Sequence, residues 1–281
     1  MDVRLDFLIV GTMKSGTSTL AAHLAAHPGL HLPVQEVHYF DREVNFRRGP
    51  AWYLRQLQRG CPPERRTSVL FGEKTPTYSY QPDCAQRISR FAPSVKLIWI
   101  FRDPVERAYS NYLHRRKKGS DLLEFEEAVA AEPERIGRDI FFGYVERSKY
   151  VLQVERFLQF FEREQMHFLT FEALLEDPAT RLNAIVAFLG RPPFTTPPEP
   201  VHINETRMPL SYRSLWAVGR IVGYDHPLYR VARALNNLVS RSPPAFPERL
   251  RAQLVERLRP YNERLAVVTG LDLTRWHESL D

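Results

Sequence analysis

The 281-residue sequence has only two cysteines and contains no internal repeat or low-complexity tract. Cys61 and Cys84 are too few for a disulfide framework and have no His or Cys at metal-ligand spacing. We therefore expect free thiols, a reducing compartment and no structural metal. The longest apolar runs have strand length, and the chain starts without the segments of a signal peptide. These absences predict a soluble, cytoplasmic protein with no membrane span.

Positive charge is what the chain has in excess. There are 39 Lys and Arg residues against 33 Asp and Glu, a formal net charge of +6. This balance suits a nucleotide, a nucleic acid or an anionic membrane surface, and composition does not choose among them. The basic run 114–118 ends an expected helix, where positive charge offsets the helix dipole. A docking rim for an anionic acceptor is the alternative. Because no nucleic-acid module is recognisable, we expect no nucleic-acid partner.

Apolar, strand-length runs alternate with helical patterns along most of the chain. The expected strands are residues 5–10, 69–72, 95–101 and 166–170, with a short strand or turn at 36–41. The expected helices are residues 16–26, 42–60, 124–131, 148–164, 171–176 and 178–189, and Asp103 and Pro104 fit the cap and first residue of another. This alternation predicts an α/β fold in which helices cover both faces of a central parallel sheet.

The length of the chain favours one domain over residues 1–281. We expect residues 5–190 to form the nucleotide-binding and catalytic core and residues 191–281 to form C-terminal loops and helices. The segment 192–200 is too rich in proline for a helix or a strand, and 203–247 has mixed periodicity.

The stretch LDFLIVGTMKSGTSTL, residues 5–20, predicts a phosphate-binding loop between a strand and a helix. Small residues let the backbone approach an anion, and the N–H groups at the helix start point toward it. Gly11 and Gly16 have the glycine spacing of the nucleotide P-loop, but Thr17 stands where that motif has lysine. The lysine of this chain, Lys14, comes three residues earlier, inside the loop. This displacement argues against a kinase or an ATPase.

The displaced lysine resembles the 5′-phosphosulfate loop of the PAPS-dependent sulfotransferases, in particular the branch of heparan-type and bacterial enzymes. Further segments resemble that family in the same order: EVHYFD at 36–41, GEKTP at 72–76, KLIWIFRDPVERAYS at 96–110, and the later helices at 171–190 and 259–276. The resemblance implies a P-loop-like fold and transfer of a sulfuryl group from PAPS to a hydroxyl, less often an amine, releasing PAP without a metal ion. Animal Golgi members carry a membrane anchor, and its absence here favours a bacterial-type enzyme.

The resemblance implies that the loop holds the 5′-phosphosulfate. The ammonium of Lys14 would stabilise the negative charge that grows on the leaving nucleotide. Backbone N–H groups and hydroxyls of Ser15, Gly16, Thr17 and Ser18 would bind the 5′-phosphate. For Thr17 and Ser18 the alternative is capping of the helix, which is compatible with phosphate binding.

Glu36 and His38 are the candidates for the base. They stand at positions i and i+2, so in an extended segment they point to the same side, and either could accept the proton of the acceptor. The resemblance gives Glu36 the role of base, and we expect His38 to orient it. One departure is Gln35, where the family usually has lysine, which removes a positive charge beside the base.

Two further strand ends carry cations. Lys74 ends one apolar run, and the resemblance places such a lysine near the transferring group; a structural ion pair with Glu73 or a nearby acid is the alternative. Arg102 ends another, and with Ser110 it matches the family's pair on the 3′-phosphate, for which arginine offers a forked donor. The alternatives are a surface salt bridge for Arg102 and a solvent-facing hydroxyl for Ser110.

Arg207, Tyr212 and Arg213 lie in the region where the family closes over the nucleotide. The acceptor is expected to be a small molecule, a glycan or a lipid, and no loop carries a readable specificity code. Two other functions remain open from the sequence. One is a P-loop kinase or NTPase, and the other is a protein that binds PAP or another anion without catalysis; intact Glu36 and Lys74 count against the second.

Overall fold

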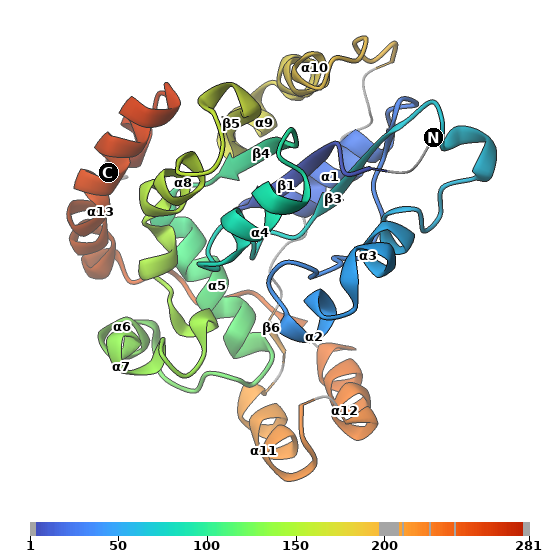
Figure 1. Ribbon diagram of the computed structural model, residues 1–281. Coiled ribbons are helices and arrows are strands. Elements are labelled where there is room, and N and C mark those ends of the chain that lie inside the picture. The colour runs from blue at the N-terminus through green and yellow to red at the C-terminus, as the bar shows by residue number, and fades with distance from the viewer. Residues whose placement is uncertain (1–3, 197–207, 210, 225, 239, 278–281) are drawn as a thin grey trace. The chain divides into compact units, whose positions relative to one another are not determined.

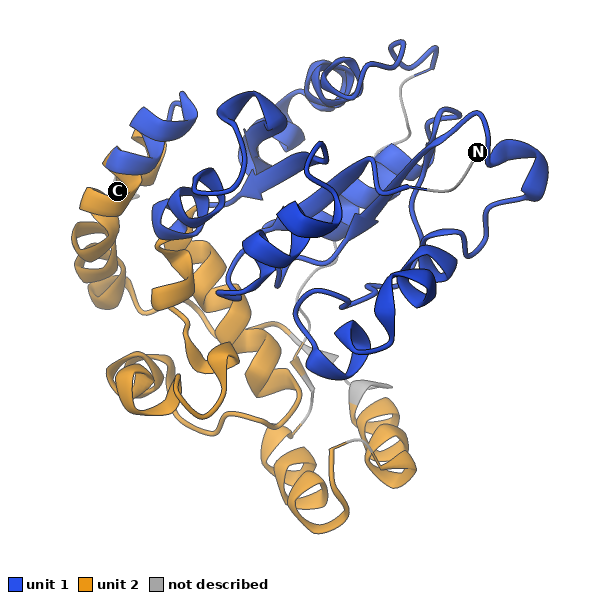
Figure 2. Ribbon diagram, in the orientation of Figure 1, with its two compact units in different colours: residues 1–102, 150–203, 264–272 blue, residues 103–149, 204–263, 273–281 orange. Residues whose placement is uncertain are grey.

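The computed structural model describes residues 4–196, 208–209, 211–224, 226–238 and 240–277. The chain divides into two compact units (Figure 2). Unit 1 comprises residues 1–102, 150–203 and 264–272, and unit 2 comprises 103–149, 204–263 and 273–281. The expectation of one domain over the whole chain stays a prediction. Arg207 and the end of the proline-rich segment lie outside the described residues.

Unit 1 is built on a five-stranded parallel sheet (Figure 1). The strand order is β2-β3-β1-β4-β5. The strands are β1 (Phe7–Gly11), β2 (Leu30–His31), β3 (Leu70–Lys74), β4 (Lys96–Phe101) and β5 (Met166–Thr170). The predicted central parallel sheet and its four longer strands are therefore confirmed. β2 was expected to be loop, because two residues are too few to show an alternating pattern.

Helices cover both faces of this sheet, as the sequence predicted. The face that carries Ile9 and Ile98 packs against α1 (Thr17–Ala25), α9 (Phe171–Glu176) and α10 (Pro178–Phe188). On the other face the ring of Trp99 meets Phe157 of α8 (Tyr150–Leu158) edge to face. Both faces are largely apolar because most strand side chains are buried.

The remaining helices of unit 1 are short. The expected helix 42–60 is two helices, α2 (Glu43–Phe46) and α3 (Gly49–Leu57), since Gly49 has a left-handed backbone with φ 77°. Helix α4 (Cys84–Phe91) is an element that the apolar pattern did not predict. Residues 36–41 contain a turn, which agrees with one of the two expected forms.

Unit 2 is mainly helical. It contains α5 (Pro104–Lys117), α6 (Phe125–Ala130), α7 (Glu132–Arg135), α11 (Tyr212–Val222), α12 (Pro227–Leu238), most of α13 (Glu248–Thr269), and the antiparallel pair β6 (Met208–Pro209) and β7 (Ser240–Arg241). The 3₁₀ turns of the two units are 63–65, 140–142, 146–148, 163–165 and 274–277. Aromatic residues such as Tyr112 and Phe125 fill the core of unit 2. Asp103 caps α5 as expected, with its side chain accepting from the N–H of Val105 and Glu106. In the described part of the chain, no helix combines the length and the apolar character needed to cross a membrane.

Candidate active site at the carboxyl edge of the sheet

The predicted phosphate loop connects β1 to α1, and its two glycines are required by close packing. A Cβ on Gly16 would lie 2.2 Å from Cδ2 of Phe171, and one on Gly11 would lie 2.6 Å from Cβ of Ser79. Gly16 has φ 83° and Lys14 has φ 72°, so two loop residues are left-handed. This conformation is unusual for lysine and is found mostly where surrounding structure imposes it, often at functional sites.

Hydrogen bonds fix the loop from within. Thr12 donates its N–H to the carbonyl of Ile100 at 2.8 Å, which ties the loop to β4. The hydroxyls of Thr12 and Ser15 share a bond of 2.6 Å, and the N–H of Ser15 donates to the carbonyl of Thr12 at 3.2 Å. The N-cap of α1 is Gly16, with no side-chain cap. The hydroxyls of Thr17 and Ser18 are therefore not used as N-caps.

Lys74 reaches this loop because of its register in the sheet. It pairs with Ile9, so it lies on the α1 face, whereas its neighbour Glu73 lies on the opposite face. The ammonium of Lys74 lies 3.2 Å from Oγ of Ser18 and 2.7 Å from Oε1 of Glu36. The alternative pairing of Lys74 with Glu73 is thus wrong, since adjacent strand residues point apart.

Glu36 is held between two cationic groups. Its Oε1 accepts from Lys74, and its Oε2 lies 3.3 Å from Nε2 of His38. Partial burial would raise the pKa of Glu36, but the hydrogen bonds from His38 and Lys74 outweigh it and lower the pKa to about 2. Glu36 is therefore ionised at neutral pH and is an acceptor for a proton.

His38 joins Glu36 to a second carboxylate. Its Nδ1 lies 2.8 Å from Oδ2 of Asp41, and that same oxygen accepts from the hydroxyl of Thr77. Burial would lower the pKa of His38, but the hydrogen bonds to Asp41 and Glu36 raise it to about 9. His38 is therefore a cation at neutral pH. It also has a left-handed backbone, with φ 53°.

Glu73 supports this turn from the other side of the strand. Its carboxylate is fully buried and accepts from the hydroxyls of Tyr53 at 2.5 Å, Tyr78 at 2.9 Å and Thr75. The Tyr78 hydroxyl in turn accepts from the N–H of Tyr39 at 2.8 Å. Burial raises the pKa of Glu73. The carboxylate thus organises three hydroxyls that position the segment carrying Glu36 and His38.

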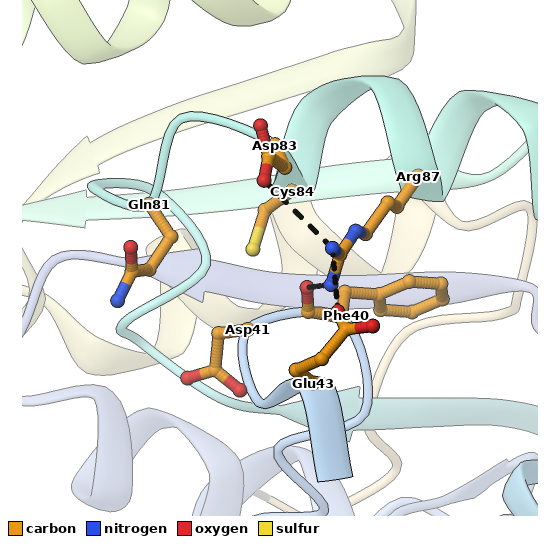
Figure 3. A pocket seen from close by; sticks show the side chains of 7 residues that line it. All are labelled: Phe40, Asp41, Glu43, Gln81, Asp83, Cys84 and Arg87. Carbon is orange, nitrogen blue, oxygen red and sulfur yellow. Dashed lines mark hydrogen bonds and ion pairs between the residues drawn. The ribbon is translucent and has the colours of Figure 1, made fainter. Parts of the chain in front are cut away.

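A cavity of about 190 Å³ lies behind this segment (Figure 3). It is lined by Phe40, Asp41, Glu43, Gln81, Asp83, Cys84 and Arg87. The guanidinium of Arg87 donates to the carbonyl of Phe40 at 3.1 Å and to Glu43 at 2.9 Å. These bonds join α4 to the turn that holds Asp41. Cys61 and Cys84 are both free and buried, as expected.

Arg102 follows β4 at the same edge of the sheet. β3, β1 and β4 are parallel neighbours, so their carboxyl ends bring Lys74, the phosphate loop and Arg102 to one edge. The guanidinium of Arg102 lies 5.8 Å from the centre of the Phe171 ring, the ring that also packs under Gly16. Its carbonyl accepts from the hydroxyl of Tyr150 at 2.9 Å.

The other predicted contacts belong to unit 2. Ser110 is a half-buried residue of α5, and its joint role with Arg102 stays a prediction. Tyr212 and Arg213 begin α11; the Tyr212 hydroxyl contacts Arg116, and Arg213 is exposed. Their contact with a nucleotide also stays a prediction.

The basic run 114–118 supplies structural contacts at two positions. Arg115 lies 2.8 Å from Asp139, and Arg116 pairs with Glu124 at 2.5 Å. At these two positions the alternative of a free docking rim loses support.

Three residues of this region were missed by sequence reasoning. Asp41 stood inside a quoted motif without a role, and its place three residues after His38 was the available signal. Thr77 gave no signal, because its contact with Asp41 joins residues 36 apart. Phe171 looked like an ordinary helix start, and only the fold brings it under the phosphate loop.

Together these residues place an ionised carboxylate and two cations beside the loop that the sequence predicts to bind an anion. Such a site can hold an anionic donor at the loop while the carboxylate takes a proton from an acceptor hydroxyl.

Comparison with known proteins agrees with this chemistry. The profile of the family described as "Sulfotransferase domain" matches residues 4–208. Mouse heparan sulfate glucosamine 3-O-sulfotransferase 5 is 30% identical over 190 residues, which cover 66% of this chain and 53% of that protein. Human heparan sulfate glucosamine 3-O-sulfotransferase 6 is 30% identical over 265 residues, 94% of this chain and 72% of that one. The chain spans between about half and three quarters of the length of these curated relatives.

A solved structure resembles the whole chain. The crystal structure of a sulfotransferase from Alicyclobacillus acidocaldarius superposes with a TM-score of 0.72 at 26% identity. The match covers 98% of this chain and all of that one. It supports the predicted P-loop-like fold.

Proposed function

Because this chain belongs to the sulfotransferase domain family, we propose that it transfers a sulfuryl group from PAPS to a hydroxyl of an acceptor. The observation that carries the proposal is the position of Glu36. Its carboxylate contacts Lys74 on one side and His38 on the other, and Lys74 also contacts the phosphate loop. The base and the donor site are thereby joined through one lysine.

The residues at the sheet edge fit PAPS. Gly11 and Gly16 let the loop pack tightly, because a Cβ at either position would meet Ser79 or Phe171, and the backbone N–H groups at the start of α1 can meet a phosphate. Lys14, Ser15, Gly16, Thr17 and Ser18 would hold the 5′-phosphosulfate, and Arg102 with Ser110 would hold the 3′-phosphate. PAPS supplies the sulfuryl group that is transferred. Lys14 would neutralise charge on the bridging oxygen of the leaving PAP.

Glu36 is proposed as the general base. It is ionised at neutral pH, and its second oxygen is oriented by His38, which Asp41 holds in turn. A carboxylate whose pKa is about 2 is a weak base while both hydrogen bonds are made. Its basicity must therefore rise during the reaction.

Lys74 provides a way for that rise to occur. Its ammonium lies between the carboxylate of Glu36 and the hydroxyl of Ser18. When Lys74 turns from Glu36 toward an anionic group at the loop, Glu36 loses one hydrogen bond and one nearby positive charge. Both losses raise the pKa of Glu36, so the base strengthens as the donor is engaged.

The acceptor is proposed to be a sugar hydroxyl of a glycan. The relatives are named as heparan sulfate glucosamine 3-O-sulfotransferases, which supports a glycan over a small molecule. A bacterial type of enzyme is supported by the likeness to the Alicyclobacillus acidocaldarius protein. The cytoplasmic location is part of this proposal and rests on the two buried free thiols.

The test uses labelled PAPS and a panel of glycan acceptors. We expect transfer of label by the wild type and a loss of about two to four orders of magnitude in turnover for Glu36→Gln, with PAP affinity nearly unchanged. The matched control is Glu64→Gln, because Glu64 is exposed in the turn 63–65. Normal turnover in Glu36→Gln with loss in His38→Asn would move the role of base to His38.

Thermal shift separates the proposal from its rivals. PAP should stabilise the protein far more than AMP or ATP, because only PAP has both the 3′- and 5′-phosphate. Greater stabilisation by ATP with Mg²⁺ would favour an NTPase. Strong stabilisation by PAP without any transfer would favour a non-catalytic binder.

A further inference from the structure

Exposed apolar side chains are concentrated in one short part of unit 2. Eleven large apolar residues are exposed in the described chain, and six of them fall within residues 216–235. They belong to α11, α12 and the turn between them, which we call the α11–α12 hairpin (Figure 1). The six are Trp216, Ile221, Tyr224, Leu228, Val231 and Leu235. Single exposed apolar residues are ordinary, but a cluster of this size marks an interaction surface.

The opposite side of the hairpin is anchored to its own unit. Leu215 and Tyr229 are buried, with exposed fractions of 1% and 3%. The Tyr229 hydroxyl donates to the carbonyl of Lys118, and a Cβ on Gly119 would lie 2.6 Å from the backbone N of Trp216. The hairpin is therefore held in place through one side and presents its other side to solvent.

The exposed residues of α12 form one stripe. Leu228, Val231 and Leu235 are spaced i, i+3 and i+7, so they lie within one face of the helix, and 55–62% of each is exposed. Ile221, which is 83% exposed, adds to this surface from α11. A stripe of this kind on a water-soluble element has no stabilising role unless something covers it.

The charge of the hairpin identifies the kind of surface that would cover it. Residues 211–238 contain four arginines, at positions 213, 220, 230 and 233, and a single acid at position 225. Arg220 and Arg230 are exposed. Arginine side chains beside an apolar stripe can place their stems along hydrocarbon while their guanidinium groups meet phosphate.

We propose that the α11–α12 hairpin docks this protein on the surface of an anionic lipid membrane. An amphipathic helix that is rich in basic residues and poor in acids binds in the plane of the membrane interface. Its apolar face then lies at the boundary between the headgroups and the acyl chains. Anionic headgroups supply the charge that complements the arginines. A lipid surface fits better than a protein partner, because the apolar side chains form a projecting stripe and every described charged residue of the hairpin is positive.

The test is co-sedimentation of the purified protein with vesicles, which does not depend on sulfuryl transfer. Vesicles of phosphatidylcholine with 30% phosphatidylserine are compared with vesicles of phosphatidylcholine alone, at low and high salt. We expect binding to the anionic vesicles, reduced at least about tenfold by high salt or by neutral vesicles. No binding to any vesicle overturns the proposal.

Two double variants and two matched controls locate the surface. Leu228→Ser/Leu235→Ser and Arg220→Gln/Arg230→Gln should each weaken binding by at least about tenfold. The controls change exposed residues of unit 1: Val34→Ser/Val267→Ser for the apolar pair, which is more exposed than the leucines, and Arg55→Gln/Arg90→Gln for the charged pair.

Controls that bind like the wild type while both hairpin variants fail support the proposal. Equal losses in the hairpin and control variants would show that binding does not depend on the hairpin and would overturn the proposal. Light scattering tests whether the surface instead joins two copies of the chain. If the wild type is a dimer that the hairpin substitutions dissociate, and it binds no vesicles, the surface is a contact between copies and the proposal is overturned.

Discussion

Lys74 and Glu36 form an ion pair of 2.7 Å although 38 residues separate them in the sequence. The same ammonium lies 3.2 Å from the hydroxyl of Ser18 at the start of α1. One lysine therefore contacts both the proposed base and the loop proposed to hold the donor. A change of charge at either place alters the other, which makes this lysine the most informative position to change.

Replacing Lys74 with methionine should alter how Glu36 titrates. Without the ammonium, the pKa of Glu36 rises from about 2 toward its ordinary value of 4.5. Because Glu36 must be ionised to act as a base, the acid-side loss of activity should move up by at least about one pH unit. Turnover should also fall by about two orders of magnitude, since a positive charge near the transferring group is lost.

The measurement is a pH profile of kcat/KM for PAPS with a glycan acceptor, because this ratio reports the free enzyme, in which Lys74 still contacts Glu36. Lys149→Met is the control, because Lys149 also pairs with a glutamate, Glu146, and has no predicted role in the reaction. If the acid side of the profile is unchanged in Lys74→Met, the ion pair with Lys74 does not set the pKa of Glu36.

Changing His38 should remove a pH dependence of stability. The pKa of His38 is raised from 6.5 to about 9, so its protonated form stabilises the fold fully below pH 6.5 and loses this effect as pH rises through 9. The wild type should lose on the order of 2 kcal/mol in free energy of unfolding between pH 6.5 and 9.5 from this group. His38→Asn should lack this loss, and asparagine tolerates the left-handed backbone.

Urea unfolding at the two pH values measures the effect. A variant that loses as much stability as the wild type over this interval would assign the pH dependence to other groups.

The sheet and the phosphate loop could be predicted because their signals are local. Residues 97–101 are continuously apolar and rich in β-branched and aromatic side chains, which few structures other than a central strand accommodate. The loop has glycines at 11 and 16, and the structure shows that each is needed by a contact rather than by flexibility alone. The resemblance then named Glu36, His38 and Lys74, and the fold brings these three together.

The contacts that were not predicted depend on the fold itself. The partner of Lys74 was left open between Glu73 and other acids, and only the register with Ile9 shows that Glu73 points to the opposite face. Phe171 is distant in sequence from Gly16 and meets it through the packing of α9 against α1. The helix hairpin within 203–247 was obscured by its exposed apolar residues, which disturb the usual pattern of an amphipathic surface helix.

Adding a methyl group at Gly16 should destabilise the loop. The new Cβ would overlap the Phe171 ring at 2.2 Å, and the backbone is left-handed with φ 83°. We expect Gly16→Ala to lose about 3 kcal/mol or more in free energy of unfolding. Gly60→Ala is the matched control, since Gly60 has φ 78° and open space around it, so only the backbone strain of about 1 kcal/mol should appear.

The double variant Gly16→Ala/Phe171→Ala tests the contact by thermal or urea unfolding. Removing the ring should recover part of the loss, so the two substitutions should not be additive. Additive losses would mean that contact with the Phe171 ring is not the reason why position 16 requires glycine.

Replacing Arg102 with alanine should weaken binding of PAP selectively. Loss of one charge-assisted hydrogen bond to a phosphate costs about 1.5–3 kcal/mol, which is about tenfold to a hundredfold in affinity. Binding of AMP should hardly change, because AMP lacks the 3′-phosphate. Titration calorimetry with both ligands measures this, and Arg90→Ala on α4 is the control. Equal losses for PAP and AMP would contradict the assignment of Arg102 to the 3′-phosphate.

Sulfuryl transfer should keep most of its rate in excess EDTA. An NTPase holds Mg²⁺ through the hydroxyl that follows Gly-Lys and through an acid at a strand end, in order to neutralise a polyphosphate. Here Thr17 replaces that lysine, and the carboxylate of Asp103 accepts from the N–H of Val105 and Glu106 at 2.8 Å, which uses it as a helix cap. A sulfuryl group also carries less negative charge than a phosphoryl group, so the ammonium groups of the site are expected to suffice. Near-complete loss of rate in EDTA, restored by Mg²⁺, would refute the metal-free reaction and return the NTPase hypothesis to consideration.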